Sequence, residues 1–292
     1  MDIFLERFLE DIKRKKLSYN TFDAYRRDIE RFYKYVDKRN LTISSVDDEV
    51  IREYFQELSK KNMANSSIVR NIISIRNFYK FLLKNKCILY NPIINFEIPK
   101  VTRKLPEILT VEEVNKLLMA PDTRTIKGIR DKAMLELLYA SGMRVTELLN
   151  IRMNEINLKL NYCIAKGSKN QERIIPIGSY AVKFLLEYLK IRDEINIHKY
   201  NFLFLNLKGF PMTRQGFWKL VKEYADNTEV YKKIDPYCLR HSFAVHLIQN
   251  GADIKTVQEL LGHKDMNTTQ IYSVISKKSK IADVYMKTHP RA

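Results

Sequence analysis

The C-terminal region of the chain carries side chains whose types and order suit phosphate chemistry. Leu239-Arg240-His241 is followed by Leu261-Gly262-His263 and then by Thr269-Gln270-Ile271-Tyr272. A tyrosine hydroxyl can act as a nucleophile, and arginine presents a fork of N–H donors that matches phosphate oxygens. This order indicates a tyrosine nucleophile directed at a phosphodiester, with cationic donors that hold the phosphate.

Two basic residues far upstream admit both a simple and a chemical interpretation. Arg144 follows Gly142 at the start of an expected helix, with Glu147 three residues later. The pair is either a weak surface ion pair or an anion-binding guanidinium that Glu147 holds in place. Lys166 lies near the turn of an expected hairpin and is either solvated or, if its pKa is lowered, a proton donor near phosphate.

The first ninety residues show the apolar spacing of amphipathic helices. This spacing predicts four helices, at residues 4–12, 22–36, 47–58 and 68–82. Three prolines then interrupt the pattern between residues 91 and 106 and predict an extended linker. The linker has basic side chains that could follow a phosphate backbone, namely Lys100, Arg103 and Lys104.

The remainder of the chain is predicted to be mainly helical, with one β-hairpin. Residues 161–165 and 172–177 read as strands on either side of a turn that carries Lys169, a candidate DNA-binding residue. Thr213 could cap a later helix that begins with Arg214 and Gln215. These two side chains are candidates for reading guanine and adenine edges, or they are simply a solvated helix start. The predicted fold class is mainly α with a small antiparallel β-sheet.

The composition favours a polyanionic partner. The 292 residues carry a formal net charge of +17, and basic residues exceed acidic ones in both halves of the chain. Such a charge suits nucleic acid or an anionic membrane surface, although a generically basic protein would also show it. No apolar run approaches the roughly 18 residues that span a bilayer, and the N-terminus does not read as a signal peptide. The three cysteines have no CxxC spacing and read as reduced thiols of a cytoplasmic protein. The sequence has no HExxH motif or Cys/His cluster, which argues against a metal site.

Taken together in order, these segments resemble the tyrosine recombinase (phage integrase) family, and most closely its Xer-type recombinases that resolve chromosome dimers. The resemblance covers essentially the whole chain. It rests on several motifs that recur together rather than on any one of them: residues 142–148, Lys166-Gly167, residues 239–244, residues 260–263 and residues 269–272.

The resemblance implies a fold, an activity and a set of roles. Residues 1–92 would form a four-helix, SAM-like core-type DNA-binding domain, residues 93–106 a basic linker, and residues 107–292 a mixed α/β catalytic domain. The enzyme would cleave and rejoin DNA through a 3′-phosphotyrosyl link, with no ATP, metal or other cofactor. Tyr272 would be the nucleophile, Arg144 and Arg240 would hold the non-bridging oxygens, Lys166 would protonate the leaving 5′-oxygen, and His263 would donate a hydrogen bond to the phosphate.

One position departs from the family pattern. The family usually has a histidine three residues before the second arginine, and here that position is Tyr237. Histidine titrates near neutrality, whereas tyrosine has a reference pKa of about 10 and is a poor base at pH 7. Tyr237 could still donate a hydrogen bond to the scissile phosphate. The chain is therefore a functional variant, a slowed enzyme or an inactive DNA-binding relative.

The resemblance also implies partners and leaves the biological role open. The expected partner is double-stranded DNA with inverted-repeat core sites, bound in a synaptic tetramer of this chain alone or with a paralogous recombinase, and no membrane. Roles in chromosome partition and cell division, in mobile-element or phage integration, or in simple strand relaxation would all use the same nucleophile.

Overall fold

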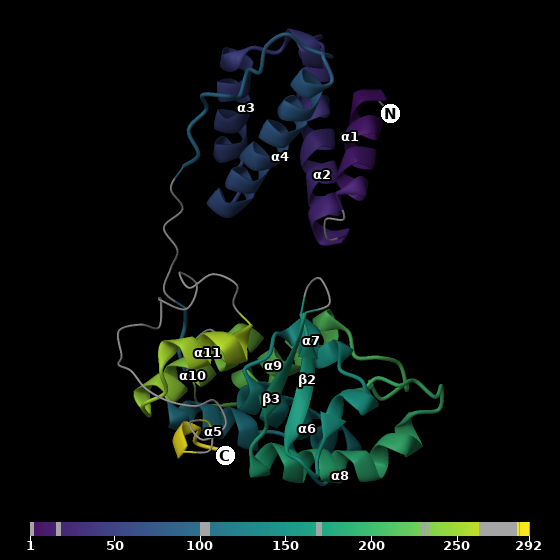
Figure 1. Ribbon diagram of the computed structural model, residues 1–292, viewed down its shortest axis with the longest axis vertical. Coiled ribbons are helices and arrows are strands. Elements are labelled where there is room, and N and C mark those ends of the chain that lie inside the picture. Colours follow the sequence, from purple (N-terminus) through teal and green to yellow (C-terminus); the bar gives the residue numbers. More distant parts are fainter. Residues whose placement is uncertain are drawn as a thin grey trace. The chain divides into compact units, whose positions relative to one another are not determined.

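The computed structural model describes residues 3–15, 19–99, 106–167, 171–228, 230, 232, 234–262, 285 and 287–291. The chain forms two compact units, Met1–Lys104 and Leu105–Ala292, which Figure 1 shows in sequence colours. Six of the predicted site residues lie outside the described residues, namely Lys100, Arg103, Lys104, Lys169, His263 and Tyr272.

The N-terminal unit is helical. Its elements are α1 (Ile3–Arg14), α2 (Tyr19–Asp37), a 3-10 helix (Ile43–Ser45), α3 (Asp48–Lys60) and α4 (Asn65–Lys84), which confirms the four predicted helices. Asp47 caps α3, because its carboxylate accepts hydrogen bonds from the backbone N–H groups of Glu49 and Val50.

The core of this unit is aromatic and contains one buried carboxylate. The rings of Phe32 and Tyr54 meet edge to face, with centroids 5.0 Å apart. Asp28 is fully buried and accepts two hydrogen bonds of 2.9 Å from Arg70. The packing continues past residue 92, the predicted end of the domain, since Ile93 is fully buried and the ring of Phe96 lies 4.9 Å from that of Phe55.

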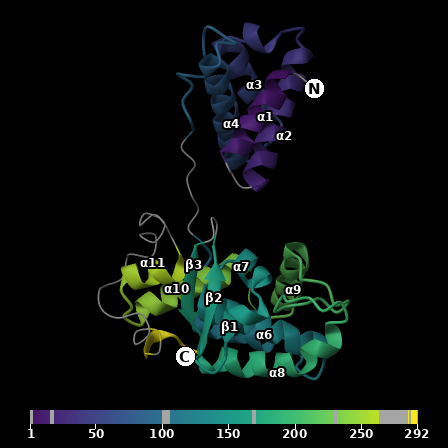
Figure 2. The same ribbon diagram turned by 45° about the vertical axis from the view of Figure 1, so that its right-hand side comes forward.

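The C-terminal unit places helices around a small sheet, as two views show (Figures 1 and 2). Its helices are α5 (Val111–Met119), α6 (Ile126–Ser141), α7 (Val145–Asn150), a 3-10 helix (Met153–Glu155), α8 (Ser179–Ile195), α9 (Arg214–Asp226), α10 (Pro236–Gln249) and α11 (Ile254–Leu261). The strands β1 (Ile156–Asn157), β2 (Tyr162–Lys166) and β3 (Glu172–Pro176) form one antiparallel sheet in that order. The predicted hairpin and the mainly helical fold class are confirmed, and the short strand β1 adds to them.

Local sequence signals explain where several of these helices begin and end. Thr110 and Glu113 form the expected capping box at the start of α5. The predicted cap Thr213 accepts a hydrogen bond from the backbone N–H of Gly216. Gly142 ends α6 with a φ of +57°, and a Cβ there would lie 2.2 Å from the ring of Phe243. The turn that delivers Arg144 therefore requires glycine at position 142.

Helix α6 is the buried centre of the C-terminal unit and packs against α8 and α10. Near the C-terminus, the hydroxyl of Tyr285 donates to the carbonyl of Ala140 at 2.7 Å and accepts from the N–H of Gly178 at 3.0 Å. Tyr285 thus packs on its own chain. Among the described helices, none combines the length and the apolar character that a bilayer crossing demands.

Candidate active site

Arg144 lies at the turn between α6 and α7, as its position after Gly142 predicts. It is the N-cap residue of α7, and its Nη1 donates to the Oε1 atom of Glu147 at 2.9 Å. The other oxygen of Glu147 accepts from the backbone N–H of Arg144 at 2.7 Å. The side chain of Arg144 remains 38% exposed. Of the two interpretations, a guanidinium held in place by Glu147 fits this geometry.

Glu147 is shared with a second arginine that the sequence analysis did not identify. Arg173 of β3 donates from Nη1 and Nη2 to the two oxygens of Glu147, at 2.9 and 2.8 Å. Burial opposes ionisation of Glu147, but the hydrogen bonds and charge of Arg173, together with Arg144, outweigh it and hold the pKa of this carboxyl below its ordinary value. Glu147 is therefore an ionised carboxylate between two guanidinium groups.

The sequence of β3 gives no clear signal for Arg173, because Ile174 and Ile175 are both apolar and show no alternation, but the burial pattern of the strand explains its role. In β3 it alternates with the fully buried Ile175, while Ile174 between them is 68% exposed. Residues two apart on a strand share a face, so Arg173 lies on the same side of the sheet as a core residue. A charged side chain on an inward face needs a partner. In the structure, Glu147 is that partner.

Arg240 reaches the same place from α10. Its side chain is buried, with Nη1 donating to the carbonyl of Gly142 at 2.6 Å and Nη2 to the carbonyl of Leu261 at 2.7 Å. Arg144 also donates from Nη2 to the carbonyl of Gly262, at 3.1 Å. The structure thus brings Arg144 and Arg240 together at the C-terminal end of α11, although 96 positions separate them in the sequence.

Lys166 ends β2, beside the strand that carries Arg173. Its Nζ forms ion pairs with Glu155 at 2.8 Å and with Glu172 at 3.1 Å. The hydrogen bonds to Glu155 and then to Glu172 raise the pKa of Lys166, which is the opposite of the lowering considered from the sequence. The raised pKa keeps Lys166 protonated but makes it a weaker acid, since a general acid donates best when its pKa lies near the working pH.

Tyr237 lies in the first turn of α10, three residues before Arg240 and hence near the same helix face. Its hydroxyl oxygen accepts a hydrogen bond of 3.3 Å from Nη2 of Arg214, the first residue of α9. The ring of Trp218 stands edge to face with that of Tyr237, with centroids 6.0 Å apart. Arg214, a candidate base-reading residue, and Tyr237, at the position of the family's usual histidine, are therefore direct neighbours. Gln215, the other candidate base-reading residue, follows Arg214 in α9.

His263 and Tyr272 follow α11 in the sequence and lie outside the described residues. Helix α11 ends at Gly262, which has a φ of +63°. Within the described ranges, no group of three or more His, Cys, Asp or Glu side chains is arranged to hold a metal ion.

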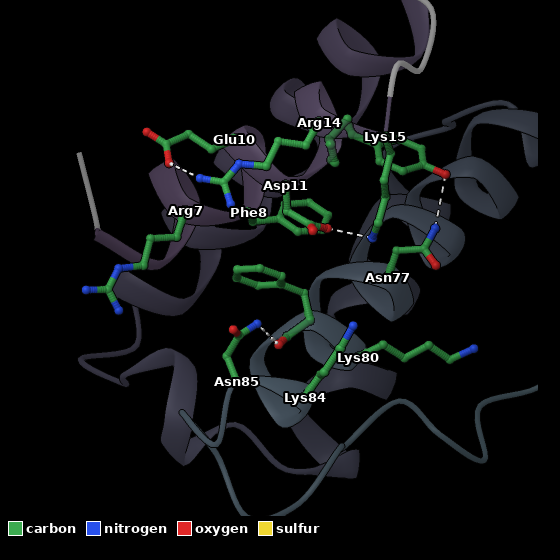
Figure 3. Close-up of a pocket in the computed structure, with 13 residues that line it drawn as sticks. Arg7, Phe8, Glu10, Asp11, Arg14, Lys15, Asn77, Lys80, Lys84 and Asn85 are labelled. Atoms are coloured by element: carbon green, nitrogen blue, oxygen red, sulfur yellow. Dashed lines mark hydrogen bonds and ion pairs between the residues drawn. The ribbon is translucent and has the colours of Figure 1, made fainter.

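A separate cleft of about 750 Å³ lies in the N-terminal unit, between α1 and α4 (Figure 3). Its basic lining residues are Arg7, Arg14, Lys15, Lys80 and Lys84. Two acids, Glu10 and Asp11, also line it, and Lys15 forms an ion pair of 2.5 Å with Asp11. The lining includes none of the predicted catalytic side chains, so this cleft is a basic surface feature of the N-terminal unit alone.

Comparisons with known proteins match both parts of the chain. Residues 107–279 match the phage integrase family, and residues 5–86 match the phage integrase N-terminal SAM-like domain. The chain is 43% identical to "Tyrosine recombinase XerD" of Staphylococcus haemolyticus (strain JCSC1435), with 100% of each chain covered. It is 42% identical to the protein of the same name from Halalkalibacterium halodurans (strain ATCC BAA-125 / DSM 18197 / FERM 7344 / JCM 9153 / C-125), with 99% and 98% covered.

Solved structures share the fold at lower identity. A crystal structure of the XerH site-specific recombinase bound to palindromic difH substrate, a post-cleavage complex, matches with a TM-score of 0.77 and 23% identity, covering 91% of this chain and 80% of that one. A lambda integrase(75-356) dimer bound to a COC' core site matches with a TM-score of 0.72 and 16% identity, covering 95% and 98%. These likenesses support the fold described above.

Proposed function

This chain belongs to the phage integrase family and is a site-specific DNA recombinase of the Xer-like tyrosine class, and we propose that it breaks and rejoins DNA through a covalent bond between Tyr272 and a 3′-phosphate. The observation that carries the proposal is the convergence of Arg144 and Arg240 at the end of α11. This end of the helix lies at Gly262, one residue before His263 and ten residues before Tyr272. Two neighbouring guanidinium groups can hold the non-bridging oxygens of one phosphate and stabilise the charge that develops on them.

The proposed chemistry begins with attack of the Tyr272 hydroxyl on the phosphorus atom. A P–O bond to tyrosine forms as the bond to the 5′-oxygen breaks, so the number of phosphoester bonds is conserved and no ATP is required. Negative charge grows on the non-bridging oxygens in the transition state. Arg144 and Arg240 stabilise that charge, because both are fixed before the reaction by Glu147 and by backbone carbonyls.

Proton transfer completes each step of the proposed reaction. The proton of the Tyr272 hydroxyl passes to solvent water as the P–O bond to tyrosine forms. Lys166, released from Glu155 and Glu172, gives a proton to the leaving 5′-oxygen and regains one from solvent, and His263 donates a hydrogen bond to the phosphate. Tyr237 acts as a further hydrogen-bond donor in place of the usual histidine. A 5′-hydroxyl of the partner strand then reverses the chemistry and restores the phosphodiester.

The proposed partner is duplex DNA with inverted-repeat core sites. Residues 1–92 would act as the core-type DNA-binding domain, joined by the basic linker at residues 93–106 to the catalytic domain at residues 107–292. The basic cleft between α1 and α4 supports contact of the N-terminal unit with phosphates. Recombination would take place in the cytoplasm, in a synaptic tetramer of this chain or of this chain with a paralogous recombinase. It would serve chromosome dimer resolution, and hence chromosome partition and cell division.

The test is to capture the covalent intermediate on chromosomal DNA, so that the target sequence need not be known beforehand. The protein is incubated with sheared and nicked chromosomal DNA of its source organism, denatured, and recovered with any DNA that remains attached. Sequencing of the attached DNA is expected to return one recurring inverted-repeat site. Recovery of unrelated sequences would favour simple strand relaxation, and salt-sensitive binding without any attached DNA would favour an inactive relative.

A further inference from the structure

Three arginines from three distant elements hold the last three carbonyl groups at the end of α11. Nε of Arg173 donates to Leu260 at 2.7 Å, Nη2 of Arg240 to Leu261 at 2.7 Å and Nη2 of Arg144 to Gly262 at 3.1 Å. The last carbonyls of a helix have no partner within the helix, and they carry the negative end of its dipole. Guanidinium groups therefore bind this end well, and here they fix it to β3, to α10 and to the start of α7.

Two of these arginines belong to the proposed catalytic set, and the third does not. The side chain of Arg173 is only 14% exposed, compared with 38% for Arg144. Arg173 uses its two terminal nitrogens on Glu147 and its Nε on Leu260. Its described bonds are directed into the protein, so it is placed to act on its neighbours rather than on DNA.

The neighbours of Arg173 are the groups that orient Arg144. Glu147 binds both the side chain and the backbone N–H of Arg144, and Arg173 binds both oxygens of Glu147 in the paired geometry that suits a guanidinium and a carboxylate. Without Arg173, the buried carboxylate would lose two hydrogen bonds and could rotate. Arg144 would then lose its fixed position relative to Arg240.

The backbone at Gly262 is shaped around Arg173. Gly262 has a φ of +63°, and a Cβ at this position would lie 3.0 Å from Nη1 of Arg173 and 3.1 Å from its Cζ. Glycine thus allows α11 to end directly against the guanidinium. The residue that follows is His263, so the segment that carries His263 and Tyr272 begins at this contact.

We propose that Arg173 is a positioning residue for DNA cleavage, which holds Glu147 and the end of α11 so that Arg144 and Arg240 face one phosphate together. The proposal rests on the proposed function. It assigns to Arg173 no contact with DNA. Loss of the paired hydrogen bonds between Arg173 and Glu147 is therefore expected to slow the chemical step and to leave DNA binding in place.

The test compares Arg173→Lys with a matched control, Arg192→Lys. Lysine keeps the charge but offers a single ammonium, which cannot bind both oxygens of Glu147 and the carbonyl of Leu260 together. Arg192 of α8 is a matched control, because it is also a buried arginine that donates to backbone carbonyls. Its side chain is 4% exposed and donates to the carbonyls of Leu203 and Tyr200. The measurement is the single-turnover rate of covalent adduct formation on a nicked duplex of the site recovered with the wild-type protein.

For Arg173→Lys we expect adduct formation to slow by about 10- to 100-fold, the effect of a displaced catalytic group, with the Kd for the duplex changed less than about threefold. Arg192→Lys should keep the wild-type rate per folded molecule. A wild-type rate for Arg173→Lys would overturn the proposal and leave the proposed function standing. If the wild-type protein itself forms no adduct, both fail.

A second substrate separates positioning from general loss of structure. A duplex with a neutral methylphosphonate at the cleavage position has less charge for Arg144 to stabilise. We expect the defect of Arg173→Lys to shrink to within about threefold on this duplex, because a misplaced guanidinium matters less when less charge develops. The ratio of the two defects is independent of the folded fraction. An equal defect on both duplexes would assign Arg173 a purely structural role, and Arg173→Gln provides the same comparison if the lysine variant is not recovered.

Discussion

The guanidinium of Arg214 donates a hydrogen bond of 3.3 Å to the hydroxyl oxygen of Tyr237. A phenolic hydroxyl that accepts one hydrogen bond still carries its own proton, which it can donate to another group. This geometry leaves the Tyr237 proton available for the proposed hydrogen bond to the phosphate. The ring of Tyr237 also packs edge to face with that of Trp218.

Replacing Tyr237 tests this role. Tyr237→Phe removes the hydroxyl and is expected to slow adduct formation on the order of 100-fold, as loss of one preorganised donor to a developing oxyanion does. Tyr237→His is expected to retain or raise the wild-type rate, because histidine can also donate and titrates near neutrality. Tyr180→Phe, at a half-exposed tyrosine of α8, is the control. A large loss in Tyr237→His would show that the site is built specifically for tyrosine.

Lys166 is expected to act on the leaving group alone. Lys166→Met should slow cleavage of an ordinary duplex by about 100- to 1,000-fold, within the usual range for a general acid. A duplex with a bridging 5′-sulfur at the cleavage position should restore most of that rate, since a thiolate leaves without being protonated. Lys190→Met, on the exposed side of α8, serves as the control. If the sulfur substrate is cut no faster by Lys166→Met, the lysine is not the acid.

The buried histidine near the C-terminus predicts a dependence of stability on pH. Burial lowers the pKa of His289 to about 3, and its Nδ1 accepts a hydrogen bond of 3.1 Å from the N–H of Arg291. The unfolded chain binds a proton near pH 6.5, whereas the folded chain does not until about pH 3. The stabilisation is therefore complete above pH 6.5 and declines as the pH falls from 6.5 toward 3.

At pH 5 this linkage costs the wild-type protein about 2 kcal/mol of unfolding free energy relative to pH 7.5. His289→Phe keeps a ring to stack on Tyr285 and has no proton to gain. Urea unfolding of both proteins at the two pH values checks the expectation. Equal losses in both would place the acid sensitivity elsewhere, for example at His246, whose pKa burial also lowers.

The sequence predicts those parts of the fold that depend on short-range patterns. Apolar spacing identified the four N-terminal helices, and Thr110, Thr213 and Gly142 marked helix ends because caps and left-handed glycines are local devices. Strand β1 has only two residues, too few for any alternation to show. The role of Arg173 depends on Glu147 and Leu260, which lie 26 and 87 positions away in the sequence and approach it only in the folded chain.

The site was predictable in its residue types and less so in its electrostatics. The family resemblance implied that Arg144 and Arg240 act on one phosphate, whereas the spacing of these residues alone did not. The raised pKa of Lys166 was not anticipated, because Glu155 lies eleven residues earlier and approaches only when β1 pairs with β2. The direction of such a shift depends on tertiary contacts that single-sequence reasoning does not provide.

The most direct test of the central claim is to identify the residue that becomes attached to DNA. The covalent protein–DNA adduct trapped on the nicked duplex is digested with nuclease and protease. The peptide that still carries a nucleotide, linked through its 3′-phosphate, is then located by mass spectrometry. We expect the modification on Tyr272, no adduct with Tyr272→Phe, and unchanged duplex affinity for that variant. A modification on another residue, or an adduct that persists in Tyr272→Phe, would contradict the assignment of Tyr272 as the nucleophile.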